Sequence, residues 1–118
     1  MTKGARHRVP ALVGALAFAV AATAAGPVKP LAFSVAIAAG DLHEECLRLD
    51  KGASRAFTWK SDQPLDFNIH YHEGKDVTYP VKADGRRDGR GTFTATLAQD
   101  YCWMWSAKAP AKLEGEIR

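Results

Sequence analysis

Apolar and polar residues alternate along much of the chain after residue 40, which predicts β-strands and not helices. The clearest segment is LDFNIHYH at 65–72, where the apolar positions are Leu65, Phe67, Ile69 and Tyr71. Successive side chains of a strand leave opposite faces, so this alternation predicts one apolar face and one polar face. Apolar residues at helical spacing are few in the same part of the chain.

Shorter segments of the same kind surround it. The strands expected from pattern and residue type cover 46–49, 55–59, 91–98, 101–106 and 112–118, with an extended segment at 77–82. Pro80 in that extended segment favours a sheet edge or a bulge. Residues 73–76 are expected to form a turn and residues 83–91 a loop, because both are rich in glycine and charge. Six or seven short strands predict an all-β, antiparallel β-sandwich of jelly-roll or immunoglobulin-like architecture.

The first forty residues differ in composition from the rest. A basic stretch at 1–10 is followed by uncharged apolar runs at 11–25 and 31–40. This order is typical of a secretory signal peptide. Its alternative is an uncleaved membrane anchor, since residues 11–28 offer about 18 mostly apolar positions, close to the length that spans a bilayer. The domain would lie outside the cytoplasm in either case, periplasmic or secreted, and at a membrane only if the leader stays attached.

Two Ala-x-Ala motifs offer cleavage sites, at 22–24 and 36–38. We predict cleavage after Ala38, because polar sequence begins directly afterwards at Asp41. The expected organisation is therefore a signal peptide at 1–38 and one domain at 41–118.

Charge gives no reason to expect a nucleic-acid partner. The net charge is +3, but the first forty residues hold four basic residues and no acid. Taking those four from the 16 Lys and Arg leaves 12, against 13 Asp and Glu. The domain is therefore close to neutral, without the basic excess of a nucleic-acid-binding domain.

The two cysteines, Cys46 and Cys102, are 56 positions apart near the two ends of the domain. An even cysteine count in an exported chain predicts a disulfide. Their Cα atoms should then lie roughly 4.4–6.8 Å apart, and a distance well above 7 Å would exclude the bond. The alternative is a pair of free thiols that bind a metal ion.

The order of several short motifs resembles that of the GOLD domain, the luminal β-sandwich of transmembrane cargo receptors. The motifs are Glu45-Cys46, the strand at 65–69, Val77–Pro80, the strand at 91–95 and Tyr101–Ser106. The resemblance implies the sandwich fold, the Cys46–Cys102 pairing and protein binding without catalysis. The chain departs from the family at the late motif, where Tyr101 and Cys102 are adjacent and Ala107 replaces the usual Asn. Those receptors continue into a coiled coil and a membrane helix, so cargo transport is not expected.

His70 and His72 form the sharpest candidate for a metal site, with zinc or copper as the ion. At positions i and i+2 of a strand their side chains share a face, as in many His-x-His half-sites. Possible third ligands are Asp66, Glu73, His43 and, for copper, Met104. The alternative is an ordinary exposed polar face.

Tyr101, Trp103 and Trp105 leave one face of their strand, opposite Cys102 and Met104. If Cys102 points into the core, the aromatic row lies outside and marks a surface for a protein or glycan. If the aromatic residues are buried, the disulfide lies at the rim of the sandwich. Residue types alone leave both orientations open.

The sequence contains no nucleophile motif, phosphate-binding loop or Cys-x-x-Cys pair, so an enzyme is not expected. The predicted function is a non-catalytic, exported binding module of the cell envelope, without a cofactor, that recognises a protein or glycan. The alternative is a periplasmic zinc- or copper-binding protein that uses His70 and His72.

Overall fold

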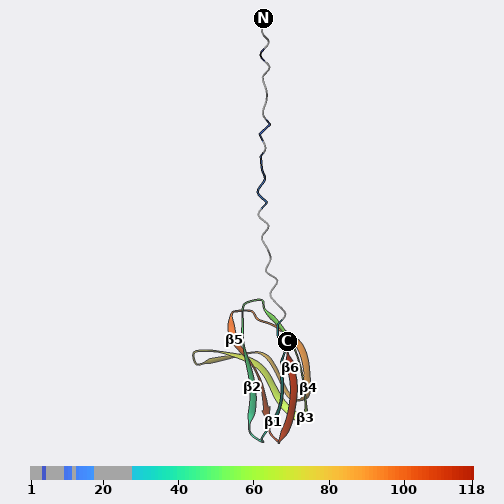
Figure 1. Ribbon diagram of the computed structural model, residues 1–118. Helices are drawn as coiled ribbons and strands as arrows, with labels where there is room; N and C mark the ends of the chain where they lie inside the picture. The colour runs from blue at the N-terminus through green and yellow to red at the C-terminus, as the bar shows by residue number, and fades with distance from the viewer. Residues whose placement is uncertain (1–3, 5–9, 12, 18–27) are drawn as a thin grey trace.

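The computed structural model describes residues 4, 10–11, 13–17 and 28–118, and Figure 1 shows the arrangement of its strands. All regular structure in these residues is β. The strands are β1 (Leu31–Ile37), β2 (Leu42–Leu49), β3 (Ser54–Glu73), β4 (Asp76–Thr94), β5 (Gln99–Ala107) and β6 (Ala111–Ile117). The described residues contain no helix long and apolar enough to cross a membrane.

All strand pairs are antiparallel and belong to one six-stranded sheet in the order β1-β6-β3-β5-β2, with β4 paired to β3 outside this path. The long strand β3 pairs with β4 along one edge. Its other edge is shared, because residues 57–61 pair with β6 and residues 65–70 pair with β5. The sheet therefore has two arms, a first arm of β1, β6 and the start of β3, and a second arm of β2, β5 and the end of β3.

Register shifts mark the junction of the two arms, between Lys60 and Leu65 and between Leu65 and Phe67. Such irregularities bend a strand and increase its twist. Aromatic side chains from the two arms meet inside the bend: the ring centroids of Phe57 and Phe67 are 5.6 Å apart, and those of Trp59 and Trp105 are 6.2 Å apart. The prediction of an antiparallel all-β fold is confirmed, as one curled sheet that folds onto itself.

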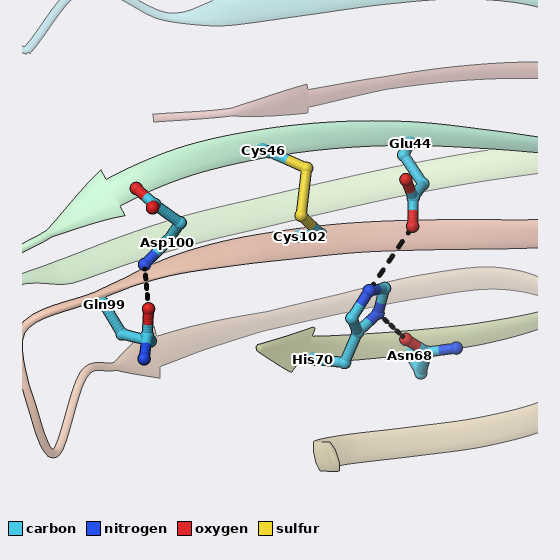
Figure 2. The surroundings of a disulfide bond; sticks show 7 residues. All are labelled: Glu44, Cys46, Asn68, His70, Gln99, Asp100 and Cys102. Atoms are coloured by element: carbon cyan, nitrogen blue, oxygen red, sulfur yellow. Dashed lines mark hydrogen bonds and ion pairs between the residues drawn. A yellow bond between two sulfur atoms is a disulfide. The ribbon is translucent and has the colours of Figure 1, made fainter. Parts of the chain in front are cut away.

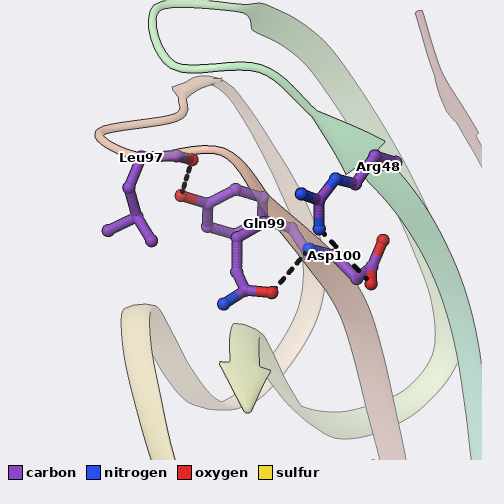
Figure 3. A network of polar contacts seen from close by, with 5 residues as sticks. Arg48, Leu97, Gln99 and Asp100 are labelled. Atoms are coloured by element: carbon purple, nitrogen blue, oxygen red, sulfur yellow. Dashed lines mark hydrogen bonds and ion pairs between the residues drawn. The ribbon is translucent and has the colours of Figure 1, made fainter. Parts of the chain in front are cut away.

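The core follows the alternation read from the sequence. Leu65, Phe67, Ile69 and Tyr71 are all buried, as are Leu113 and Ile117 of β6. Tyr101 of β5 is also buried, and its hydroxyl donates a hydrogen bond to the carbonyl of Leu97 at 2.9 Å. This bond satisfies the polar end of a ring that otherwise packs among apolar groups. Figure 3 labels Leu97, which accepts this bond, and the nearby ion pair of Arg48 with Asp100.

Aromatic rings cover glycines on paired neighbouring strands. Phe33 pairs with Gly115, and Trp59 pairs with Gly89. A Cβ atom at Gly115 would lie 2.5 Å from the ring of Phe33, and one at Gly89 would clash with the indole of Trp59. Glycine is required at both positions because the rings occupy the space of a side chain.

The folded unit starts earlier than residue 41. β1 pairs with β6 along its whole length, from Leu31 opposite Ile117 to Ile37 opposite Ala111. Phe33 and Ile37 belong to the core, so cleavage after Ala38 would remove a core strand. The folded unit therefore begins ahead of the boundary predicted at residue 41, since residues 31–37 form a strand although their composition also suits the end of a leader. The earlier motif at 22–24 lies outside the described residues.

The predicted loop at 83–91 is wrong, since these residues belong to β4. In the part of the chain that the structure describes, β4 pairs only with β3, so its second edge is open and its charged side chains are exposed to solvent. Gly85 has a φ of 66°, which lets the strand bend at the junction of the arms. The edge position expected from Pro80 and the turn at 73–76 agree with the structure.

Candidate binding surface

The aromatic row of β5 faces the core and is not a binding surface. Tyr101 and Trp103 are 0% exposed and Trp105 is 1% exposed. Trp105 lies between Phe33 of the first arm, at 4.9 Å between ring centroids, and Phe67 of the second, at 5.4 Å. The predicted use of these three residues as partner contacts is therefore wrong, because the curl of the sheet encloses them.

The predicted disulfide between Cys46 and Cys102 is present and lies on the outer face of the second arm (Figure 2). The two residues are directly opposite each other on β2 and β5, with 4.0 Å between their Cα atoms. This distance is slightly below the expected range. Cys46 is exposed and Cys102 half-buried, so the bond is accessible from solvent.

His70 is the centre of a polar cluster beside the disulfide (Figure 2). Its strand neighbour across the sheet is Cys102. Its Nδ1 lies 2.7 Å from Oδ1 of Asn68, and its Nε2 lies 3.4 Å from a carboxylate oxygen of Glu44. His70 leaves the outer face as predicted, but it is only 4% exposed because neighbouring strands cover it.

Burial lowers the pKa of His70, since a charged imidazolium loses hydration there. The carboxylate of Glu44 opposes this shift, and the neighbouring His72 adds to it. The net direction favours the neutral ring, whose Nδ1 must carry the hydrogen because an amide oxygen only accepts hydrogen bonds.

The surface continues from His70 onto the β3–β4 hairpin. His72 is exposed, with its ring centroid 5.1 Å from that of His70, and it pairs with Val77 of β4. The Tyr79 ring lies 5.8 Å from the His70 ring. Val77 and Tyr79 are 37% and 48% exposed, large values for apolar side chains. We call His72, Val77 and Tyr79 the hairpin patch.

The proposed third metal ligands are scattered. His43 points to the inner side, where its ring lies 5.7 Å from that of Phe33 and its Nε2 contacts Glu45. Asp66 accepts a hydrogen bond from the backbone of Gly85, and Glu73 is exposed near the turn. Met104 shares the outer face, opposite Asn68 and Glu44.

Within the described residues, one group of three potential ligands has donor atoms within 4.8 Å of one another: Glu44, His70 and Cys102. His72 is not part of this group. The sulfur of Cys102 is bonded to Cys46 and is no metal ligand in that state. The predicted pair of exposed histidines therefore differs from the arrangement found, in which Glu44 and Asn68 surround a buried His70. Sequence reasoning missed both. Asn68 lies two residues before His70 on the same face of β3, so the alternation already placed these two together. Glu44 comes from β2 and joins them only through the pairing of β2 and β3 with β5.

No protein-family model matches the chain, and no curated protein matches it in sequence. Solved structures are similar in fold. The Yersinia pseudotuberculosis-derived mitogen has a TM-score of 0.56 at 7% identity, over 75% of this chain and 84% of the mitogen. Aeromonas hydrophila PliG, a periplasmic inhibitor of g-type lysozyme, has a TM-score of 0.50 at 14% identity, over 75% of this chain and 86% of PliG.

A de novo designed double-stranded β-helix has a TM-score of 0.44 at 12% identity, over 75% of this chain and 99% of the design. At such identities these similarities concern the fold alone. None of the three structures is a GOLD domain, and that resemblance stays a prediction.

Proposed function

We propose that this chain is an exported, non-catalytic domain that binds another protein through the β3–β4 hairpin. The observation that carries the proposal is the hairpin patch. The β3–β4 turn projects from the body of the sheet in Figure 1. It presents Val77 and Tyr79, both more than a third exposed, on a strand whose second edge is unpaired in the described part of the chain.

Exposed apolar side chains next to a free strand edge are typical of protein contacts, because both side chains and backbone groups are available to a partner. A protein partner is favoured over a glycan. The aromatic row that motivated a glycan lies in the core, and Tyr79 is the one aromatic residue of the described chain with a large exposed fraction.

The solvent-accessible disulfide and the leader composition support export. Among the structural neighbours, PliG is by its description a periplasmic inhibitor, which is a protein-binding role in the same kind of compartment. The absence of a catalytic motif in the sequence supports a non-catalytic role.

The test compares partner capture by wild type, by Val77→Ser/Tyr79→Ser and by Leu42→Ser, each immobilised against an envelope extract. Leu42 is 50% exposed and pairs with Ser106, four residues along β5 from Cys102, so it is a matched apolar control. We expect a protein that wild type and Leu42→Ser retain and the double variant loses. Equal capture by all three would contradict the proposal. Inhibition of a g-type lysozyme is a direct candidate activity to measure in parallel.

A further inference from the structure

The cluster beside the disulfide contains two groups that face each other without a hydrogen between them. Nδ1 of His70 donates to Oδ1 of Asn68 at 2.7 Å, so the lone pair of the neutral ring is on Nε2. That lone pair points toward the carboxylate of Glu44, 3.4 Å away. Both groups are electron-pair donors, so a cation bound between them would interact favourably with each.

The surroundings of His70 are those usual for a metal-binding histidine. Metal-binding histidines usually donate their other ring N–H to an oxygen acceptor, which fixes the tautomer and the orientation of the ring. Asn68 does this here from the same face of β3. The cluster draws its donors from β2, β3 and β5, which are adjacent in the sheet, so the backbone holds them in place.

The sulfur of Cys102 is the third donor of the group, and Cys46 is directly opposite it. We propose that reduction of the Cys46–Cys102 disulfide turns this cluster into a zinc site. Its ligands would be the two thiolates, His70 Nε2 and one oxygen of Glu44. Four ligands of nitrogen, sulfur and oxygen are a set that tetrahedral Zn²⁺ accepts. The inference is independent of the proposed partner binding.

The chemistry balances with a dithiol as reductant. Its two thiols supply two electrons and two protons, the sulfur–sulfur bond of the protein breaks, and the dithiol becomes a disulfide. Zn²⁺ then displaces the two protons of the protein thiols as they become thiolates. Cys46 is exposed, so the reductant can reach the bond. While the bond is intact only His70 and Glu44 remain as ligands, and zinc affinity should be low.

The experiment titrates the full-length protein with Co²⁺ and then Zn²⁺, before and after reduction by a phosphine. Reduced wild type should give the intense near-ultraviolet bands of cobalt–thiolate bonds, and one equivalent of Zn²⁺ should abolish them. Replacing His70 by Gln should weaken zinc binding about tenfold or more, because even an outer contact of a metal ligand contributes about 10–100-fold. His72→Gln is the matched control, an exposed histidine two residues away that should bind like wild type.

Reduction alone could unfold the chain, so near-ultraviolet circular dichroism of the buried tryptophans is recorded in the same samples. Zn²⁺ should restore the folded signal of reduced wild type. The variant Cys46→Ser, which cannot form the bond and keeps three ligands, should melt at a higher temperature with Zn²⁺ than without. Equal zinc affinity before and after reduction would overturn the proposal. So would equal binding by His70→Gln and His72→Gln, or thiolate bands from a chain that stays unfolded.

Discussion

The two faces of β5 place neighbouring residues in opposite environments. Trp103 and Trp105 on the inner face are almost completely enclosed. They contact Phe57 and Trp59 of the first arm, and Trp105 also contacts Phe67 of the second. Cys102 and Met104 on the outer face are half-buried. Cys102 lies opposite Cys46 and His70, and Met104 lies opposite Glu44 and Asn68. The inner face contributes apolar burial to stability, and the outer face holds the groups that can react or bind.

A shift of one residue in the pairing of β5 would exchange these faces. The indoles are the largest apolar side chains of the strand, and enclosing them sets the orientation. The disulfide and the histidine cluster are outside as a consequence. The predictions below test this division, from the largest expected effect to the smallest.

Removal of β1 should have the largest effect, because it opens the inner face. We expect a chain of residues 28–118 to fold and a chain of residues 39–118 to fail to give a cooperative thermal transition. The shorter chain loses Phe33 and Ile37, each contributing roughly 1.5–3 kcal/mol of burial, and uncovers Trp105. Melts followed by near-ultraviolet circular dichroism measure this. Identical transitions for the two chains would show that β1 is dispensable, and cleavage after Ala38 would then be compatible with the fold.

Single substitutions on β5 compare the two faces directly. Trp103→Ala should lower the free energy of unfolding by about 3–5 kcal/mol, the usual cost of removing a buried aromatic side chain. Met104→Ala, one residue away on the outer face, should cost below about 1 kcal/mol. Urea unfolding gives both values. If Met104→Ala lowered the free energy of unfolding as much as Trp103→Ala, the division between the faces would be wrong.

The disulfide lies on the outer face and stabilises the fold by restricting the conformations of the unfolded chain. Its two cysteines are 56 positions apart, and a double Cys46→Ala/Cys102→Ala variant should lose about 2–4 kcal/mol of unfolding free energy. The measurement is urea unfolding without reductant. Reduced wild type provides the control, and it should match the double variant in metal-free buffer. A difference between the two would assign part of the effect to the alanine side chains.

The smallest effect concerns pH and His70. Since burial lowers the pKa of His70 below 6.5 in the folded state, the unfolded chain takes up the proton first as the pH falls. The contribution of His70 to stability is complete above about pH 6.5 and is lost as the pH falls through the folded-state pKa, by at most about 1.4 kcal/mol per pH unit.

Unfolding free energies at pH 7.5 and pH 5.0 test this for wild type and His70→Gln. We expect the stability of the variant to change less between the two pH values than that of wild type. His72→Gln serves as the control, because His72 is exposed. Parallel pH profiles for wild type and His70→Gln would show that the ring is as easily protonated in the folded protein as in the unfolded one.

Several features could be read from residue order because they depend on local geometry. The alternation from Leu65 to Tyr71 predicts that these apolar side chains share one buried face, because every second side chain of a strand leaves the same face. The turn at 73–76 follows from its glycine, which adopts a φ of 58° in the structure. The even cysteine count, together with the expectation of export, predicts the disulfide.

Tertiary structure decided the features that depend on which strands become neighbours. LAFSVAI at 31–37 alternates like a strand, yet its composition also suits a leader, and only pairing with β6 distinguishes the two. Both rows of β5 offer candidates for the core, the aromatic row on one face and Cys102 with Met104 on the other. The rings of Phe33 and Phe67, which pack against Trp105, decide the orientation.

His70 combines both kinds of information. Its position in the alternation determined that it leaves the outer face of β3. Whether solvent reaches the ring depends on side chains from other strands. Here Glu44 of β2 and Tyr79 of β4 lie against it. Period determines the direction of a side chain because it is a property of one strand, whereas burial and chemical partners depend on long-range pairing.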